Sequence, residues 1–454
     1  MAEIKNSFLR SKMNKDLDDR LIPNGEYRDA QNISVGKSED DDIGALETVL
    51  GNAIKTFSIT PALPDDMQTI GYLTDNYSNT IFVFATNYTD TDPNIEPTYA
   101  PLTKRCIIYS WTPNNPATAK IIADGSFLNF STTNPIQVSL IEELLFFTDN
   151  RNQPRKVNIT QENNYYTNEV QISVAKYNPY LPISLLKKTT GIVLNQTTTA
   201  TTFYVLRNTK IEIGMSVIST SSTGTSKINP SDYVKVQNLI DANLGGVLMT
   251  VVVLSKQVAA PAVGDRFTFL ISTMTNESSS ATWPGDPDYL ESRYVRFSYR
   301  YRFDDGEYSL FAPFTQIAYI PKQKGYFKNG DENEAFRSTI VAWFENNVNN
   351  IELLITLPDD KSTLSTSFKI TSLDILYKES DQTTVKVLET IPYSVIDSDG
   401  VDNLYTYEYQ SRKPYKTLPT DQTIRVYDKV PVRAFSQETA GNRIIYGNFR
   451  DTYT

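Results

Sequence analysis

Closely spaced acidic residues are the first candidates for chemistry in this chain. Glu39-Asp40-Asp41-Asp42 forms one run, and Asp304-Asp305-Gly306-Glu307 forms another. Carboxylate oxygens bind hard cations such as calcium, but the second run lacks the spacing of an EF-hand loop. We therefore interpret the first run as a solvated loop and the second as a hairpin turn, and we expect no metal site.

Enzyme chemistry has little support in the composition. The 454 residues include no histidine, which removes the commonest general base and the commonest zinc ligand. The sequence contains no G-x-S-x-G elbow, P-loop or G-x-G-x-x-G. Cys106 is the only cysteine, so no intramolecular disulfide can form, and its apolar neighbours predict a core residue. We expect neither catalytic activity nor a cofactor.

The charge balance argues against a protein that grips nucleic acid. Lys and Arg total 43 against 53 Asp and Glu, a net charge of −10. An acidic surface repels phosphate, which suits a wall that DNA slides past, although acidity also serves solubility alone. The chain has no signal-peptide core and no apolar run near the ~18 residues of a membrane span. We expect no membrane anchor and synthesis in a cytoplasm.

The stretch 295–303 alternates apolar and polar residues with a period of two. This pattern predicts a half-buried strand with Phe297, Tyr299 and Tyr301 in the core. The opposite face is expected to lie on a polar surface or against a neighbouring subunit, because arginine is favoured at protein interfaces. The interface candidates on that face are Arg296, Arg300 and Arg302.

The elements that position these residues are predicted to be short strands. The 28 Tyr and 21 Phe favour strands, and 23 Pro with 19 Gly favour turns. Strand-like runs spaced as in a sandwich, barrel or propeller fill residues 61–187. Residues 247–254 admit a buried helix, but their β-branched valines favour a strand.

The expected fold is all-β, with a β-propeller-like body, an inserted small β-barrel or sandwich, and a fibronectin type III-like sandwich behind an extended arm. The last segment is too short to close a blade, so we expect a longer parent protein, a cleaved product or partner strands. The expected units are an extended N-terminal arm (1–60), propeller blades (61–187), the insert (188–281), hairpins returning to the main body (282–350), the fibronectin type III-like sandwich (351–415) and the start of a further blade (416–454).

The N-terminal arm and a C-terminal run carry a family resemblance. Pro23-Asn24-Gly25 predicts a turn, and few core-forming residues precede Ile54, so the arm is either solvated or buried by a neighbour. The run from Leu21 to Ile33, "LIPNGEYRDAQNI", and the run from Pro431 to Asn448 resemble tail nozzle proteins of short-tailed bacteriophages, above all the muzzle proteins of crAss-like phages. The assembly-arm candidates are Leu21, Pro23, Gly25, Tyr27 and Arg28.

That resemblance implies a structural subunit of a phage tail in the virion, assembled in the bacterial host cytoplasm. It implies a homo-oligomeric ring, expected to be a hexamer, that forms the wall of the distal DNA exit channel. Its partners would be adjacent tail hub or ring proteins and tail fibres, with viral DNA passing through without specific binding.

Two other classes stay open at this point. A glycan-binding host-attachment protein would use the faces of Trp111, Trp283 or Trp343, although each is expected more often as a partly buried residue. A propeller hydrolase would need an acid pair, and none can be assigned among 53 carboxylates.

Overall fold

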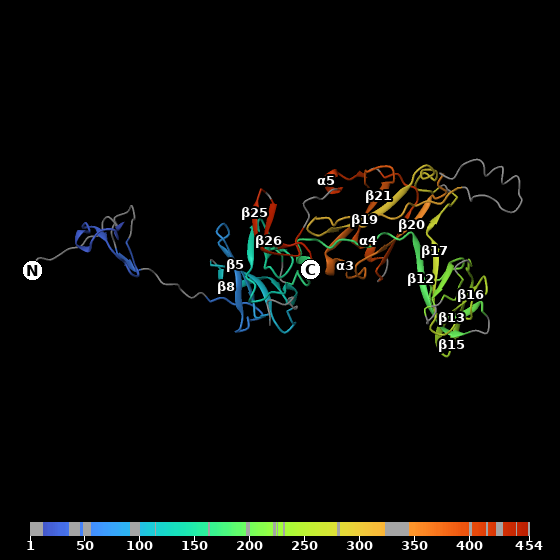
Figure 1. The fold of residues 1–454 in the computed structure, drawn as a ribbon, viewed down its shortest axis with the longest axis horizontal. Coiled ribbons are helices and arrows are strands. Elements are labelled where there is room, and N and C mark those ends of the chain that lie inside the picture. The colour runs from blue at the N-terminus through green and yellow to red at the C-terminus, as the bar shows by residue number, and fades with distance from the viewer. Residues whose placement is uncertain are drawn as a thin grey trace, which may run out of the picture.

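The computed structural model describes residues 12–35, 46–48, 56–90, 100–113, 115–161, 164–196, 200–220, 224, 226–229, 232–278, 282–322, 345–398, 402–414, 416–423, 430–441 and 443–452. Glu39-Asp40-Asp41-Asp42 and Trp343 lie outside these residues. The chain forms several packed β-sheets along one axis (Figure 1). The predicted all-β class is confirmed, and the propeller arrangement of its blades stays a prediction.

The arm contains two small strand pairs. β1 (Lys12–Met13) pairs in parallel with β2 (Glu26–Tyr27), and the 3-10 helix η1 (Asp19–Leu21) lies between them in sequence. β3 (Ile33–Val35) pairs antiparallel with β4 (Leu46–Thr48). Figure 1 shows these elements at the N-terminal end of the molecule, in blue.

The first body packs two antiparallel sheets around one aromatic core. Phe84, Phe130 and Phe147 meet at its centre, with ring centroids 5.2 to 6.1 Å apart. Cys106 is fully buried beside them, as its apolar neighbours predict. One sheet orders β5 (Gln68–Asp75), β6 (Thr80–Thr86), β7 (Cys106–Thr112) and β8 (Asn115–Asp124); the other orders β11 (Arg155–Asn158), β10 (Leu144–Thr148) and β9 (Gln137–Ile141). The 3-10 helix η2 (Ser126–Leu128) and α1 (Glu169–Ile172) complete this body.

The C-terminal hairpin returns to the first body. β25 (Arg433–Ala440) and β26 (Arg443–Arg450) pair antiparallel. The Asn150 amide donates to the Ala434 carbonyl at 2.8 Å, and Gln437 Nε2 donates to the Phe146 carbonyl at 2.8 Å. The segment expected to open a further blade therefore lies against β9 and β10, nearly 300 residues earlier in sequence.

The second body is a sandwich of two facing sheets. One sheet orders β19 (Val295–Phe303), β21 (Ile370–Glu379), β22 (Lys386–Pro392) and β24 (Lys416–Thr417); the other orders β18 (Met274–Thr275), β20 (Asn350–Thr356) and β23 (Leu404–Tyr409). The short helices are α3 (Leu364–Phe368), α4 (Tyr393–Asp397) and α5 (Thr420–Thr423). β19 pairs with β21 along its whole length. The predicted boundary at residue 350 thus falls inside a single core, and the units expected on either side of it are one unit.

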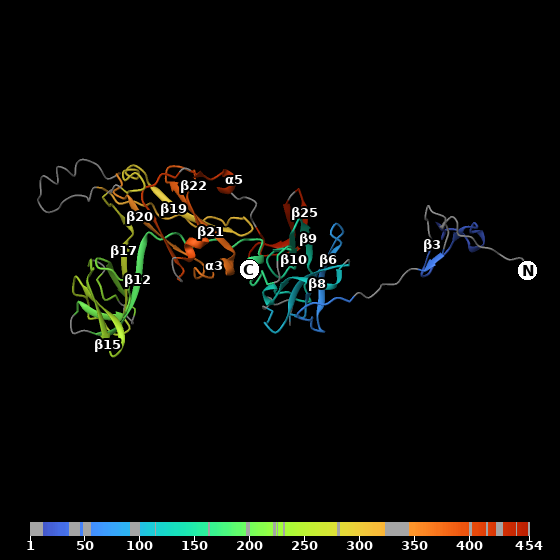
Figure 2. The same cartoon turned by 180° about the vertical axis from the view of Figure 1, so that it is seen from behind.

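The insert is a curled six-stranded sheet that follows α1 of the first body and precedes β18 of the sandwich in the chain. Its strands are β14 (Ser216–Thr220), β17 (Arg266–Ser272), β12 (Leu186–Gln196), β13 (Thr202–Leu206), β16 (Val247–Leu254) and β15 (Val236–Leu244), in that order across the sheet. A bridge between Ser216 and Lys235 joins its two edges around a core that includes Phe203, Phe267 and Phe269. Residues 247–254 form a strand, as predicted. Figure 2 shows the insert on the side of the sandwich away from the first body.

Candidate assembly site

The predicted arm residues form a small structure held by polar contacts. Gly25 has φ of +100° and closes the predicted turn, in which the Glu26 amide donates to the Pro23 carbonyl at 3.1 Å. Arg28 bonds Asp19 and donates to the Leu17 carbonyl at 3.3 Å. These contacts tie Arg28, on one side of the arm's turn, to the segment that carries Leu21 on the other.

The arm exposes its apolar side chains. Leu21 is 67% exposed and Met13 is 47% exposed. Tyr27 lies on β2, where its carbonyl accepts from the Asn14 amide at 2.9 Å. An arm that orders its backbone through polar contacts but leaves its leucines in water is suited to pack against another surface.

The arginine strand is placed differently from the prediction. Phe297, Tyr299 and Tyr301 are buried, as predicted, and burial raises the pKa of Tyr301 well above its ordinary value. Arg300 is also buried, however, and its Nε lies 2.9 Å from Asp374 Oδ2. The expectation of a wet face with three arginines is therefore wrong at Arg300.

The physical reason is a partner on the neighbouring strand. Asp374 on β21 lies directly opposite Arg300 in the register, and both side chains are 2% exposed. The Tyr308 ring lies 3.8 Å from the Arg300 guanidinium carbon, and Gln422 accepts from Arg300 at 3.1 Å. Arg296 is half-buried and Arg302 is exposed, so an interface role stays a prediction for those two.

The acidic turn at 304–307 docks onto lysines of the first body. Lys176 Nζ lies 2.5 Å from Asp305 Oδ2, and Lys156 bonds Glu307 and lies 3.7 Å from Asp305. Burial acts to raise the pKa of Asp305, but its hydrogen bond to Lys176 and the two lysine charges outweigh this and lower it. The predicted hairpin turn thus forms a charged contact between the two bodies.

Two short helices complete this joint between the bodies. Asn168, which caps α1, donates from Nδ2 to the Ser367 carbonyl of α3 at 2.7 Å. Gln171 donates to the Thr366 carbonyl at 2.8 Å. Lys369 lies 4.1 Å above the ring of Tyr165, a cation–π contact.

The joint surrounds a small polar cavity of about 180 Å³, lined by charged groups and tyrosines. Its lining lacks the apolar character of a small-molecule site. We therefore interpret the joint as a mechanical connection between the first body and the sandwich.

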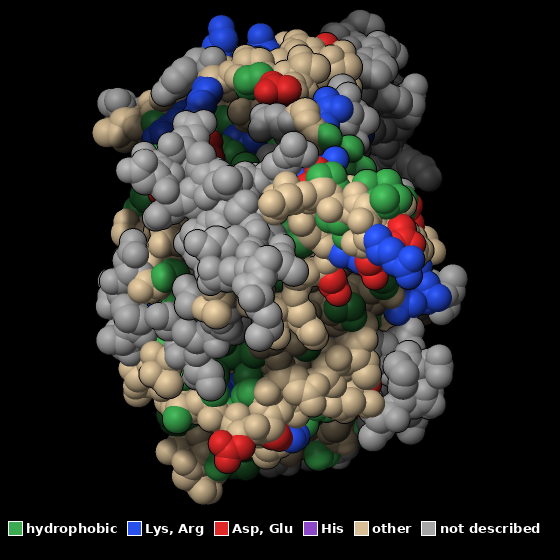
Figure 3. Space-filling model, turned by 90° about the vertical axis from the view of Figure 1, so that its left-hand side faces the viewer, with side chains coloured by type: hydrophobic (Ala, Val, Ile, Leu, Met, Phe, Trp, Pro, Cys, Tyr) green, Lys and Arg blue, Asp and Glu red, His purple; other side chains and the backbone are tan. Residues whose placement is uncertain are grey.

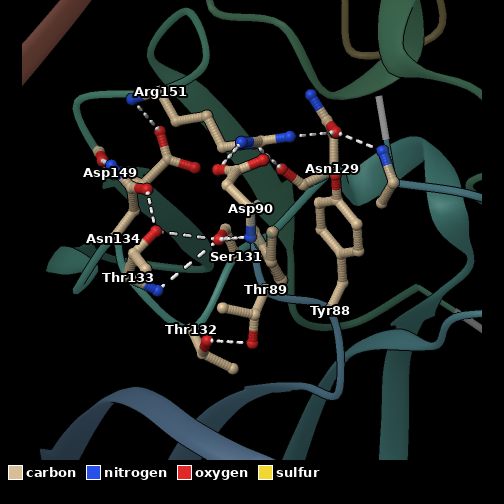
Figure 4. Close-up of polar contacts among 12 residues, drawn as sticks. Tyr88, Thr89, Asp90, Asn129, Ser131, Thr132, Thr133, Asn134, Asp149 and Arg151 are labelled. Carbon is tan, nitrogen blue, oxygen red and sulfur yellow. Dashed lines mark hydrogen bonds and ion pairs between the residues drawn. The ribbon is translucent and has the colours of Figure 1, made fainter. Parts of the chain in front are cut away.

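A buried polar cluster lies on the first body, close to the point where the C-terminal hairpin attaches (Figure 4). Arg151 forms an ion pair with Asp90, and the two side chains are 1% and 5% exposed. Arg151 Nε also donates to the Asn129 carbonyl at 2.9 Å. Asp149 accepts from the Arg151 amide at 2.9 Å and from Asn152 Nδ2 at 2.6 Å.

This cluster fixes the backbone on which the hairpin docks. Asn150, between the two anchored residues Asp149 and Arg151, has φ of +56° and donates its amide to Ala434. The sequence places 150–154 in a polar turn, and the structure buries Arg151 and Asn152 there. No pattern in the sequence identifies Asp90 as the partner, because it lies 61 residues earlier.

The described residues offer no centre for metal chemistry. Within them, no three His, Cys, Asp or Glu side chains gather as a metal site. Basic and acidic side chains are interspersed on the end of the molecule seen in Figure 3. None of the described helices has the length and apolar character needed to cross a membrane.

The described chain is all-β, with an arm held by polar contacts and a charged joint between its two bodies. Residues 5–225 match the protein-family model described as Crassvirus muzzle protein. The predicted resemblance to the muzzle family is thereby confirmed over the arm, the first body and the first half of the insert. That family is a viral structural one and not an enzyme class. No curated protein matches the chain.

Proposed function

We propose that this chain is a structural subunit of a bacteriophage tail muzzle. In this proposal, copies form a homo-oligomeric ring that walls the distal DNA exit channel and anchors neighbouring tail proteins. The ring is a hexamer, and tail hub or ring proteins and tail fibres are its other partners. Viral DNA passes through the channel without specific binding, and the chain assembles in the host cytoplasm.

The observation that carries this proposal is the family match over the N-terminal half of the chain. The arm supports it, because Leu21 and Met13 are exposed on a segment with little core of its own. A heterologous contact between an arm and the body of the next copy generates a ring when its rotation closes. The net charge of −10 keeps phosphate from adhering to the wall.

The glycan-binding alternative gains no comparable support. Trp111 is half-buried and stacks near Phe57, with ring centroids 6.3 Å apart. Trp283 is also half-buried. Both positions fit the partly buried role that the sequence favours for each tryptophan.

Quantitative mass spectrometry of purified tails tests the proposal. We expect the chain in tails detached from capsids, at a copy number that is a multiple of six per particle. A chain that is absent from washed particles, or present in less than one copy each, would contradict the proposal. A constant copy number that is not a multiple of six would contradict the hexamer alone.

A further inference from the structure

The insert differs in charge from every other large part of the chain. Residues 186–272, from β12 to β17, contain eight Lys and Arg against four Asp and Glu, a net charge of +4. Residues 276–423, which form most of the sandwich, contain fifteen against twenty-three, a net charge of −8. Because the whole chain carries −10, the insert is a basic module on an acidic protein.

The outer face of the insert carries an apolar patch. Strand alternation puts Phe203, Val205 and Val252 in the core, so the residues between them point outward. In the register of the three strands, Ile240 pairs with Val251 and Val251 with Tyr204. We define the outer patch as Tyr204, Leu206, Ile240, Leu244, Val247 and Val251.

The outer patch is continuous over three strands. Leu244 lies opposite Val247 at the end of the β15–β16 hairpin, on the same face as the Ile240–Val251 pair. Val251 is 7% exposed and belongs to no core cluster, so its neighbours on the patch cover it. Around it, Leu206 is 60% exposed, Ile240 51% and Val247 44%. Such a contiguous apolar face on a soluble module marks an interaction surface.

We infer that the outer patch docks onto the acidic sandwich of a second copy of this chain. Charge complementarity favours this partner surface. The insert, which bears the patch, is basic, and the sandwich of the next copy in a ring is acidic. Tyr204 forms one side of this apolar face, on the strand next to Val251, and aromatic residues are enriched at the cores of protein interfaces. This inference rests on the proposed ring and names one of its contacts.

The test uses the full chain and replaces exposed patch residues by threonine, which keeps β propensity. Leu206→Thr with Ile240→Thr forms the patch variant. Val263→Thr is the matched control, because Val263 is 61% exposed on the same insert but lies outside its strands. Lys188→Glu with Lys235→Glu, both exposed, reverses charge on the insert. Light scattering after size exclusion measures the mass, and circular dichroism checks the fold.

We expect the wild-type chain and Val263→Thr to associate, and the patch variant to associate at least tenfold more weakly. The charge-reversal variant should weaken association most at low salt, because exposed charges are screened as salt rises. A wild-type chain that is monomeric at every concentration would overturn the inference.

Two further results would also overturn this inference, and neither of them would refute the proposed ring. Oligomers that form equally well with the folded patch variant would remove the patch as a contact but keep the ring. Binding of the wild-type chain to vesicles of phosphatidylcholine and phosphatidylglycerol, lost in the patch variant while oligomers persist, would make a bilayer the occupant. The ring itself is judged by the copy number in purified tails.

Discussion

Arg300 on β19 and Asp374 on β21 form an ion pair at 2.9 Å inside the sandwich, with both side chains 2% exposed. The two residues are 74 positions apart and lie directly opposite each other in the strand register. Thr390 of β22 also donates to Asp374, at 2.6 Å. The pair therefore connects three adjacent strands of one sheet.

Removing one partner of this pair should destabilise the sandwich strongly. Arg300→Ala leaves the Asp374 carboxylate buried without its cation, which typically costs about 3–5 kcal/mol. Chemical denaturation of the full chain measures the loss. Arg302→Ala is the control, because Arg302 is exposed on the same strand. If the two variants unfold at the same denaturant concentration, the pair does not hold the sheet.

Charge reversal in the joint should uncouple the two bodies. Lys156→Glu places a third carboxylate beside Asp305 and Glu307. Because the cores of the two bodies are separate, each should stay folded. Calorimetry should then resolve a separate unfolding transition for each body, and therefore more transitions than for the wild-type chain. The double variant Lys156→Glu with Glu307→Lys restores opposite charges and should restore the wild-type unfolding profile. If the single variant unfolds like the wild-type chain and the double variant restores nothing, the charged contact does not couple the two bodies.

The joint should also weaken in acid. The pKa of Asp305 is lowered in the folded chain, mainly by Lys176 against the opposing effect of burial. Its stabilising contribution is therefore complete above the ordinary carboxyl pKa of 3.8 and is lost as the pH falls through the lower folded value. Burial raises the pKa of the adjacent Asp304, and that group contributes with the opposite sign. Asp305→Asn should flatten the loss of stability below pH 3.8, and an unchanged slope would assign the acid sensitivity to other groups.

The arm should matter for assembly and not for folding of the bodies. Deleting residues 1–50 removes β1 to β4, in which β1 pairs with β2 and β3 pairs with β4. The melting temperature of the remaining chain should stay within a few degrees, while incorporation into tails is lost. Leu21→Asp, at a 67% exposed position, should reproduce the assembly defect in the full-length chain. A large drop in melting temperature after deletion would place the arm in the core.

Local patterns predicted individual strands well. Alternation in 295–303 placed Phe297, Tyr299 and Tyr301 in the core, because a period of two leaves no choice of face. The apolar neighbours of Cys106 predict a core residue, and Cys106 is buried.

Pairings between distant residues could not be predicted in the same way. The alternation predicts an exposed Arg300, but the carboxylate of Asp374, 74 residues later in the chain, compensates its buried charge. The same holds for Asp305 with Lys176 and for Arg151 with Asp90, whose partners come from separate elements. The pattern of a single sequence predicts which face of a strand a residue occupies. It does not predict which distant charged residue lies opposite that residue in the fold.

The central claim is that this chain is a structural part of a phage tail. Electron microscopy of native particles labelled with an antibody against this chain tests it most directly. We predict label at the distal end of the tail, centred on the tail axis as a ring requires. Label on the capsid, at the tips of fibres away from the axis, or on no particle at all would contradict the claim.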